Sequence, residues 1–235
     1  MTLSIIPVTG IGEIAAGDEL AVLIADAARE QGTPLAARDC IVVTQKVVSK
    51  AENRLVPLDP DDLAARRALV EAESVRIVRR RGDLIISETP HGFICANAGV
   101  DLSNVDAGWA ALLPVDSDRS AKHIRDALRA RTGVDVAVVI SDTFGRPWRR
   151  GLTDVAIGVC GIAAVLDLRD TPDAHGRTLL VTEVAVADEI ASAAELVMGK
   201  AAAIPAAIVR GLEPGWFRNA TVRELIRPVD EDLFR

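Results

Sequence analysis

The strongest candidate for chemistry in this sequence is the stretch VAVVISDTFGRPWRRG, residues 136–151. Its apolar run is typical of a strand buried on both faces, and it ends in Ser141, Asp142 and Thr143. Strand ends are where α/β proteins place ligand-binding groups. A carboxylate beside a hydroxyl suits a divalent metal ion that carries phosphate. Asp142 and Thr143 are therefore candidate metal-binding residues, and an Asp that merely caps a turn is the alternative.

Three arginines follow these residues, at positions Arg146, Arg149 and Arg150. The guanidinium group presents forked donors that match phosphate and carboxylate. Arginines on a solvated face would give the same pattern. The spacing alone leaves both interpretations open.

A second oxygen-rich stretch is NAGVDLSNVDAGWAALLPVD, residues 97–116. Asp101, Ser103, Asn104 and Asp106 lie among glycines, as in a turn, but the same short polar side chains are hard oxygen ligands for Mg²⁺ or Mn²⁺. A metal ion joining Asp101 to Asp142 would offset the cost of bringing the two carboxylates together. Without that metal, Asp101 is better explained as a turn residue.

Three further segments carry weaker signals. PVTGIGEI, residues 7–14, could present backbone N–H groups to phosphate or grip a base and ribose, although a plain strand-to-helix turn explains it as well. TQKVVSKAE, residues 44–52, places Lys46 and Lys50 four apart after a buried strand, a spacing equally common on a solvated helix. MGKA, residues 198–201, offers Lys200 to phosphate, or simply a glycine that ends a helix.

Composition narrows the class of protein. The 235-residue chain is 49% hydrophobic and 26% charged, with a formal net charge of −7, which argues against a general nucleic-acid or membrane-surface binder. The three scattered cysteines predict reduced core residues in a cytoplasmic protein, and the three isolated histidines disfavour a His-metal site. We expect no signal peptide, and no segment reaches the ~18 apolar residues of a membrane span.

The hydrophobic pattern predicts a mixed α/β or α+β fold without repeats or flexible linkers. Expected strands cover residues 3–8, 40–48, 134–142 and 206–211, and residues 84–89 and 91–100 look like paired strands. Expected helices cover residues 17–32 and 118–133, with one or two charged helices over 59–83. Residues 179–200 read as a strand leading into an Ala-rich helix, and the C-terminal tail is polar and peripheral.

Five segments, taken together and in their order along the chain, resemble the coenzyme F420 γ-glutamyl ligase family. They are PVTGIGEI, VVTQKVVSKAENRLV, NAGVDLSNV, VISDTFGRPWRRGLTDVAIGVCG and VTEVAVADEIASAAELVMGK. The resemblance covers nearly the whole of residues 1–235. It implies one ligase domain with an α+β fold, built from two interleaved subdomains without a clear boundary, and a homodimer. Some relatives carry a further flavin-binding, reductase-like domain, so we expect that activity to be absent from a chain that stops at Arg235.

The resemblance also implies a reaction and its site. Family members join L-glutamate to coenzyme F420-0, or to a dehydro precursor, using GTP and two divalent metal ions, Mg²⁺ or Mn²⁺. By matching motif, Asp101 and Asp142 would share one metal and Thr143 would help to hold a second. The residues expected to contact GTP are Ile11, Gly12, Glu13, Ile14, Gln45, Lys50 and Asn104. Some members have Gln in place of Lys200, so a metal contact there is not carried over.

This chemistry suits a chain without an obvious Ser or Cys nucleophile. Phosphorylation of a carboxylate by GTP gives an acyl phosphate that an amine can attack, and the site contributes mainly electrostatics and positioning. Because the reactants and the protein are all anionic, local cations such as Lys46, Lys50, Arg146 and Arg149 would offset the field. The alternatives are a metal-dependent phosphohydrolase and a non-catalytic GTP-binding protein.

Overall fold

The computed structural model describes residues 2–233, and a five-stranded sheet forms its centre. The strand order is β1 (Ser4–Val8), β12 (Ala206–Arg210), β2 (Cys40–Thr44), β8 (Ala137–Arg146) and β9 (Arg149–Cys160). β2 and β8 run parallel, while the other neighbouring pairs are antiparallel. The one parallel pair is decisive for the site, because two strands end at the same edge of the sheet.

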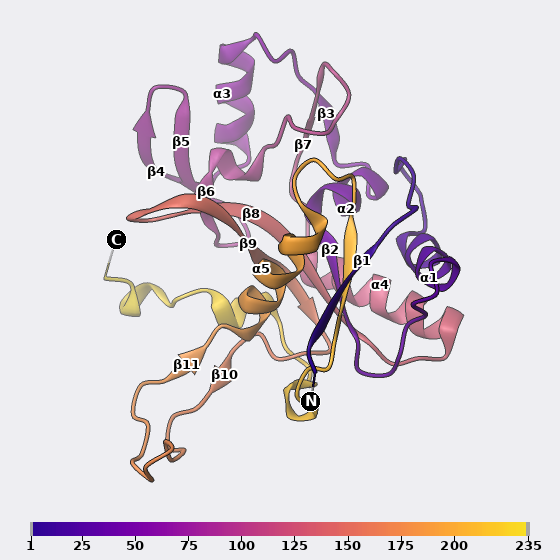
Figure 1. The fold of residues 1–235 in the computed structure, drawn as a ribbon. Coiled ribbons are helices and arrows are strands. Elements are labelled where there is room, and N and C mark those ends of the chain that lie inside the picture. The colour runs from indigo at the N-terminus through magenta and orange to yellow at the C-terminus, as the bar shows by residue number, and fades with distance from the viewer. Residues whose placement is uncertain (1, 234–235) are drawn as a thin grey trace.

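Helices cover both faces of this sheet, as Figure 1 shows. α1 (Leu20–Glu30) and α4 (Ser117–Thr132) pack on one face, and α5 (Val186–Met198) packs on the other. Side chains of β2 alternate accordingly: Ile41 and Val43 join the α1 and α4 side, and Cys40 and Val42 join the α5 side. A strand that is apolar on both faces is what a buried central strand requires.

A smaller lobe is inserted in the chain between α2 (Gln45–Ala51) and α4, and Figure 1 shows it above the central sheet. It contains β3 (Leu55–Pro57), α3 (Leu63–Ala72), β4 (Arg76–Arg81), β5 (Leu84–Glu88), β6 (Ile94–Ala96), the 3₁₀ turn η1 (Asn97–Gly99) and β7 (Trp109–Ala111). Most of its buried apolar residues form a hydrophobic cluster of their own, whereas Phe93 packs into the cluster of the sheet. The arrangement confirms an α+β fold, with the smaller lobe formed by one contiguous stretch of the chain.

The remaining elements are peripheral. β10 (Leu166–Asp167) and β11 (Glu183–Val184) form the base of an arm that projects from the body in Figure 1. The C-terminal segment contains the short 3₁₀ helices η2 (Pro214–Trp216), η3 (Val222–Leu225) and η4 (Val229–Glu231). Cys40 and Cys95 are buried free thiols, as predicted, whereas Cys160 is a free thiol that is only partly buried.

Two of the predicted elements change type part of the way along. The helical pattern over residues 59–83 ends at Ala72, and Arg76–Arg81 forms β4, because antiparallel pairing with β5 supplies its backbone hydrogen bonds. The strand predicted over residues 40–48 ends at Thr44 and continues as α2. The helical turn buries Val48, an outcome that an apolar run alone does not distinguish from a strand.

The pairing predicted between residues 84–89 and 91–100 is confirmed, because β5 and β6 pair antiparallel, but β6 covers only Ile94–Ala96 and Asn97–Gly99 forms η1. The helix predicted to end at Gly133 does so, with that glycine in the left-handed conformation. Within the described chain, no helix is both long and apolar enough to cross a bilayer.

Candidate functional site

The parallel strands β2 and β8 bring together the segment that begins at Thr44 and the segment that contains Asp142 and Thr143. Thr44, at the end of β2, lies opposite Ser141 of β8. The residues after Thr44 therefore emerge beside Asp142 and Thr143. Sequence positions nearly 100 residues apart become neighbours through strand pairing alone.

The antiparallel strands bring three more segments to the same edge. Asp154 of β9 pairs with Thr143, and the end of β1 at Val8 pairs with the start of β12 at Ala206. Residues 11–14 follow β1, and residues 199–205 precede β12. Both loops consequently lie at the edge where β2 ends and Asp142 lies.

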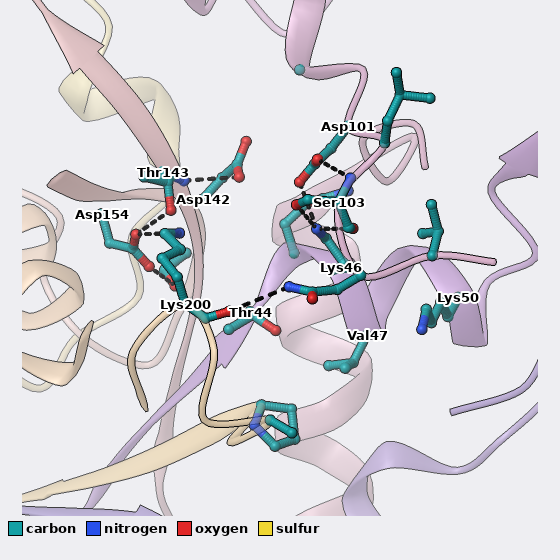
Figure 2. A pocket seen from close by; sticks show the side chains of 18 of the residues that line it. Thr44, Lys46, Val47, Lys50, Asp101, Ser103, Asp142, Thr143, Asp154 and Lys200 are labelled. Atoms are coloured by element: carbon teal, nitrogen blue, oxygen red, sulfur yellow. Dashed lines mark hydrogen bonds and ion pairs between the residues drawn. The ribbon is translucent and has the colours of Figure 1, made fainter. Parts of the chain in front are cut away.

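A pocket of about 1080 Å³ opens between this edge and the inserted lobe. Figure 2 shows two polar groups facing each other across it: Asp142, Thr143, Asp154 and Lys200 on one side, and Lys46, Asp101 and Ser103 on the other. All ten predicted site residues line the pocket, namely Ile11, Gly12, Glu13, Ile14, Gln45, Lys50, Asp101, Asn104, Asp142 and Thr143. The structure thus gathers in one place the segments that the sequence scatters.

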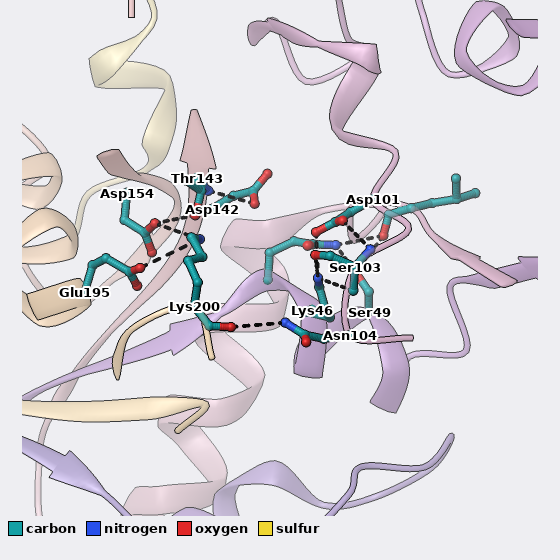
Figure 3. Close-up of polar contacts among 12 residues, drawn as sticks. Lys46, Ser49, Asp101, Ser103, Asn104, Asp142, Thr143, Asp154, Glu195 and Lys200 are labelled. Carbon is teal, nitrogen blue, oxygen red and sulfur yellow. Dashed lines mark hydrogen bonds and ion pairs between the residues drawn. The ribbon is translucent and has the colours of Figure 1, made fainter. Parts of the chain in front are cut away.

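Asp154 organises the first group. Its carboxylate is 3% exposed and accepts hydrogen bonds from Ser141 Oγ at 2.9 Å and Thr143 Oγ1 at 2.5 Å. Lys200 Nζ lies 3.5 Å from the same carboxylate and 3.8 Å from Glu195, as Figure 3 shows. The buried charge of Asp154 is therefore compensated by two hydroxyls and one ammonium group.

Asp142 is a pocket acid whose charged form is disfavoured by its surroundings. Its pKa is raised to about 7, chiefly by burial and also by the nearby carboxylates of Asp101 and Asp154. The Thr143 N–H, which donates to Asp142 Oδ1 at 2.8 Å, and the Lys200 ammonium offset part of that increase. A carboxylate in this environment gains stability from a bound cation.

Asp101 belongs to the second group and is held by the inserted lobe and α2 together. Lys46 Nζ lies 2.6 Å from Asp101 Oδ2, and the Ser103 N–H donates to Oδ1 at 2.7 Å. Burial raises the pKa of Asp101, but the hydrogen bonds from Lys46 and Ser103 outweigh it and leave the pKa below its usual value. Asp101 is thus a charged carboxylate at the wall of the pocket.

Asn104 joins the two sides. Its Nδ2 donates to the Lys200 backbone oxygen at 3.4 Å, a contact drawn in Figure 3. Asn104 adopts a left-handed conformation with φ of +51°, which Asn tolerates better than most residues. The contact links the loop of the inserted lobe to the loop that precedes β12.

The residues expected to contact GTP differ in how they meet the pocket. Lys50 is 11% exposed and pairs with Glu13, which is 82% exposed, so the two side chains link α2 to the loop after β1. Gln45 is 2% exposed, and its amide nitrogen donates to Ser49 Oγ at 2.7 Å and to the Leu112 oxygen at 3.0 Å. The Ile14 side chain belongs to the hydrophobic core. Any contact from Ile14 to a ligand therefore comes from its backbone.

The arginines at the tip of the β8–β9 hairpin lie outside the pocket. Arg146, Arg149 and Arg150 are exposed, and Arg146 donates to the Arg150 backbone oxygen at 3.0 Å. The structure therefore gives Arg146 and Arg149 no contact with the pocket, and a contribution of their charge to the field of the site stays a prediction. The hairpin continues beyond the sheet edge and carries these side chains away from it.

Several pocket residues carried no clear signal in the sequence. Asp154 looked like one acid in an apolar, Gly-rich run, and Glu195 and Arg66 looked like polar residues of ordinary helices. One feature of the sequence could have indicated Asp154: it lies on the segment that follows the turn predicted at residues 145–147, and that segment can pair with the strand before the turn. Strand pairing then places it beside Thr143.

The pocket offers carboxylate and hydroxyl oxygens, the kind of ligand that divalent Mg²⁺ and Mn²⁺ prefer. Among residues 2–233, no three or more His, Cys, Asp or Glu side chains form a group that could hold a metal ion by themselves. Mg²⁺, however, commonly takes one or two protein carboxylates and completes its shell with substrate phosphates and water. Asp101 and Asp142 fit that mode of binding.

The fold and pocket define an enzyme whose acidic residues and lysines converge between a sheet edge and an inserted lobe. Residues 10–211 match the family model described as F420-0:Gamma-glutamyl ligase. The chain is 46% identical to the coenzyme F420:L-glutamate ligase of Methanothermobacter thermautotrophicus over the full length of both. It is 44% identical to that of Methanopyrus kandleri, covering 100% of this chain and 98% of the relative.

A third relative, from Methanocaldococcus jannaschii, is 41% identical over 86% of each chain and has the same name. The chain therefore belongs to the F420-0:gamma-glutamyl ligase family. It is a ligase that forms carbon–nitrogen bonds.

Proposed function

We propose that this enzyme uses GTP to attach L-glutamate to coenzyme F420-0 or its dehydro precursor. The product carries one glutamate or a γ-linked tail of several. The observation that carries the proposal is the convergence of residues 11–14, Lys50, Asn104, Asp101, Asp142 and Thr143 on one pocket. The names of the relatives support glutamate and the coenzyme as substrates. The GTP requirement, the metals and the intermediate are our inference.

The chemistry requires an activated carboxylate, because a carboxylate oxygen is a poor leaving group in water. A carboxylate oxygen of F420-0 attacks the γ-phosphorus of GTP, and GDP leaves. The glutamate amine then attacks the carbonyl carbon of the acyl phosphate. The amide forms as inorganic phosphate departs with the former carboxylate oxygen, and the amine loses a proton.

The acidic residues would hold the divalent metals in this reaction. Asp101 and Asp142 would share one ion from opposite sides of the pocket, and Thr143 Oγ1 would contribute to a second. Bound Mg²⁺ or Mn²⁺ would neutralise phosphate charge and orient the transferred phosphoryl group. Asp154 would keep the Thr143 hydroxyl turned through their 2.5 Å hydrogen bond.

The nucleotide would lie along the loop after β1 and the end of α2. The backbone of Ile11–Ile14 is available for hydrogen bonds to the base or phosphates, and Lys50 supplies a point charge. Asn104 lies where its amide can bind the nucleotide and still contact the Lys200 loop. Gln45 contributes mainly by holding α2 to the inserted lobe, with its amide oxygen as the group left for a ligand.

We also propose a homodimer, as the family resemblance implies. Exposed apolar side chains such as Trp148, Leu152, Leu180 and Val181 lie on the two projecting hairpins. Light scattering at micromolar concentration should give twice the chain mass. A monomer at that concentration would remove the dimer from the proposal.

Mass spectrometry of the products tests the proposed function. Purified protein, GTP, Mn²⁺, L-glutamate and F420-0 should yield glutamylated coenzyme together with GDP, and omission of any one substrate should abolish the product. Phosphate release without glutamate would indicate a phosphohydrolase. Binding of GTP without turnover would indicate a non-catalytic protein.

A further inference from the structure

Arg66 is a cation at the pocket that the functional assignment leaves unused. It lies in the first turns of α3, is partly buried, and lines the pocket from the inserted lobe. Within residues 2–233, its guanidinium group makes no hydrogen bond or ion pair. Burying part of a guanidinium without an acceptor costs free energy unless another molecule supplies the acceptor.

The other cations of the pocket differ from Arg66 in this respect. Lys46 pairs with Asp101, Lys50 pairs with Glu13, and Lys200 lies near Asp154 and Glu195. Each of these lysines faces a carboxylate of the protein. In the described part of the chain, Arg66 is the one pocket cation that faces none.

The acids nearest to Arg66 along α3 are engaged elsewhere. Asp62 caps the helix by accepting from the Ala65 N–H at 2.9 Å, and Glu71 accepts from Arg80 at 2.6 Å. The neighbouring Arg67 pairs with Asp83 at 2.8 Å, outside the pocket lining. Arg66 thus lines the pocket without pairing with either of these acids of its own helix.

The pocket is otherwise rich in negative charge. Its lining includes the acidic residues Glu13, Asp101, Asp106, Asp142, Asp154 and Glu195. An anionic substrate entering this field needs a cation that is free to bind it. The planar fork of an unpaired arginine matches a carboxylate or phosphate group in two parallel hydrogen bonds.

We infer that Arg66 is a substrate-binding residue that takes a carboxylate or phosphate group of one ligase substrate. This inference rests on the proposed function for the identity of the substrates. Arg66 comes from the inserted lobe, whereas residues 11–14 and Asp142 come from the sheet edge. Arg66 thereby anchors the substrate on the wall of the pocket that the inserted lobe forms, opposite the sheet edge.

The test compares Arg66→Gln, Arg66→Lys and the control Arg67→Gln in steady-state ligase assays. Each substrate (GTP, L-glutamate or F420-0) is varied while the other two are saturating. Arg66→Gln should raise the KM of one substrate about 10- to 100-fold, the loss expected for a charge-assisted contact, with a smaller change in kcat. Arg66→Lys should recover part of the affinity, and Arg67→Gln should behave like the wild type.

The substrate whose KM rises identifies the source of the anionic group. KM values within twofold of wild type for all three substrates would overturn the inference, as would an equal rise in all three. If the wild-type protein lacked ligase turnover, the proposed function would fail. Calorimetric titration of GTP, of glutamate and of F420-0 into wild type and Arg66→Gln would then decide: a selective loss of affinity supports Arg66 as an anion-binding residue, and three unchanged affinities refute it.

Discussion

The Thr143 hydroxyl donates a 2.5 Å hydrogen bond to the buried carboxylate of Asp154, across the antiparallel pair β8 and β9. Because the proton points to Asp154, the oxygen lone pairs are free to bind a cation. Thr143→Val keeps the shape but removes the oxygen, so we expect turnover to fall about 10- to 100-fold, the range for disrupted metal shells.

Thr143→Ser is the matched control, since it retains the oxygen and loses only a methyl group. It should keep most of the turnover at saturating Mn²⁺. Equal activity of Thr143→Val and wild type across a Mn²⁺ titration would show that this hydroxyl holds no metal.

Asp142→Asn should abolish binding of the shared metal, because it removes the charge while keeping the side-chain shape. We expect turnover to fall by at least about 100-fold, and Asp101→Asn should behave alike. Circular dichroism should be unchanged, and Asp126→Asn, an exposed substitution on α4, is the control. Near-normal turnover of either variant at limiting Mn²⁺ would contradict the shared-metal assignment.

Lys50→Ala should weaken GTP binding by about one to two orders of magnitude, since a charge-assisted contact contributes roughly 1.5–3 kcal/mol. Lys50 is 11% exposed, and its partner Glu13 remains solvated after the substitution. Glutamate affinity should change less.

Titration of GTP at fixed Mn²⁺ measures the effect of Lys50→Ala. Lys122→Ala, on the exposed face of α4, should leave GTP affinity unchanged. If Lys50→Ala also left the GTP affinity unchanged, the role of Lys50 would be limited to linking α2 to the loop that contains Glu13.

Gly158→Ala should destabilise the fold. A Cβ at this position of β9 would lie 2.4 Å from the Ser117 backbone oxygen, at the start of α4. Such overpacking costs about 1–3 kcal/mol, or a Tm lower by roughly 2–12 °C in a domain of this size. Gly215→Ala meets no atom within 4 Å and is the control. Equal Tm values in thermal melts would show that α4 moves aside freely.

The sequence predicted many of the residues that line the pocket, but not the contacts that support them. Asp142 and Thr143 could be identified because a buried strand leads directly to them. The roles of Asp154 and Arg66 could not, because each depends on contacts between distant segments. Asp154 reaches Thr143 through strand register, and Arg66 reaches the pocket through the packing of the inserted lobe.

Secondary structure failed where local pattern and long-range pairing disagree. The charged run Arg76–Arg81 looked helical, yet β5 supplies a strand partner for it. Val47 and Val48 suited a longer strand, but Gln45 and Ser49 bond the Leu112 oxygen only from a helix. The parallel pairing of β2 with β8 is likewise invisible in either segment alone.

The central claim is that the pocket activates a carboxylate by transferring phosphate to it, and isotope transfer tests this most directly. F420-0 labelled with ¹⁸O in its carboxylate is incubated with enzyme, GTP, Mn²⁺ and L-glutamate, and the released phosphate is analysed by mass spectrometry. An acyl-phosphate route predicts one ¹⁸O atom in each phosphate released with glutamylated product. Unlabelled phosphate, with one ¹⁸O atom of each amidated carboxylate released into water instead, would contradict transfer of phosphate to the carboxylate.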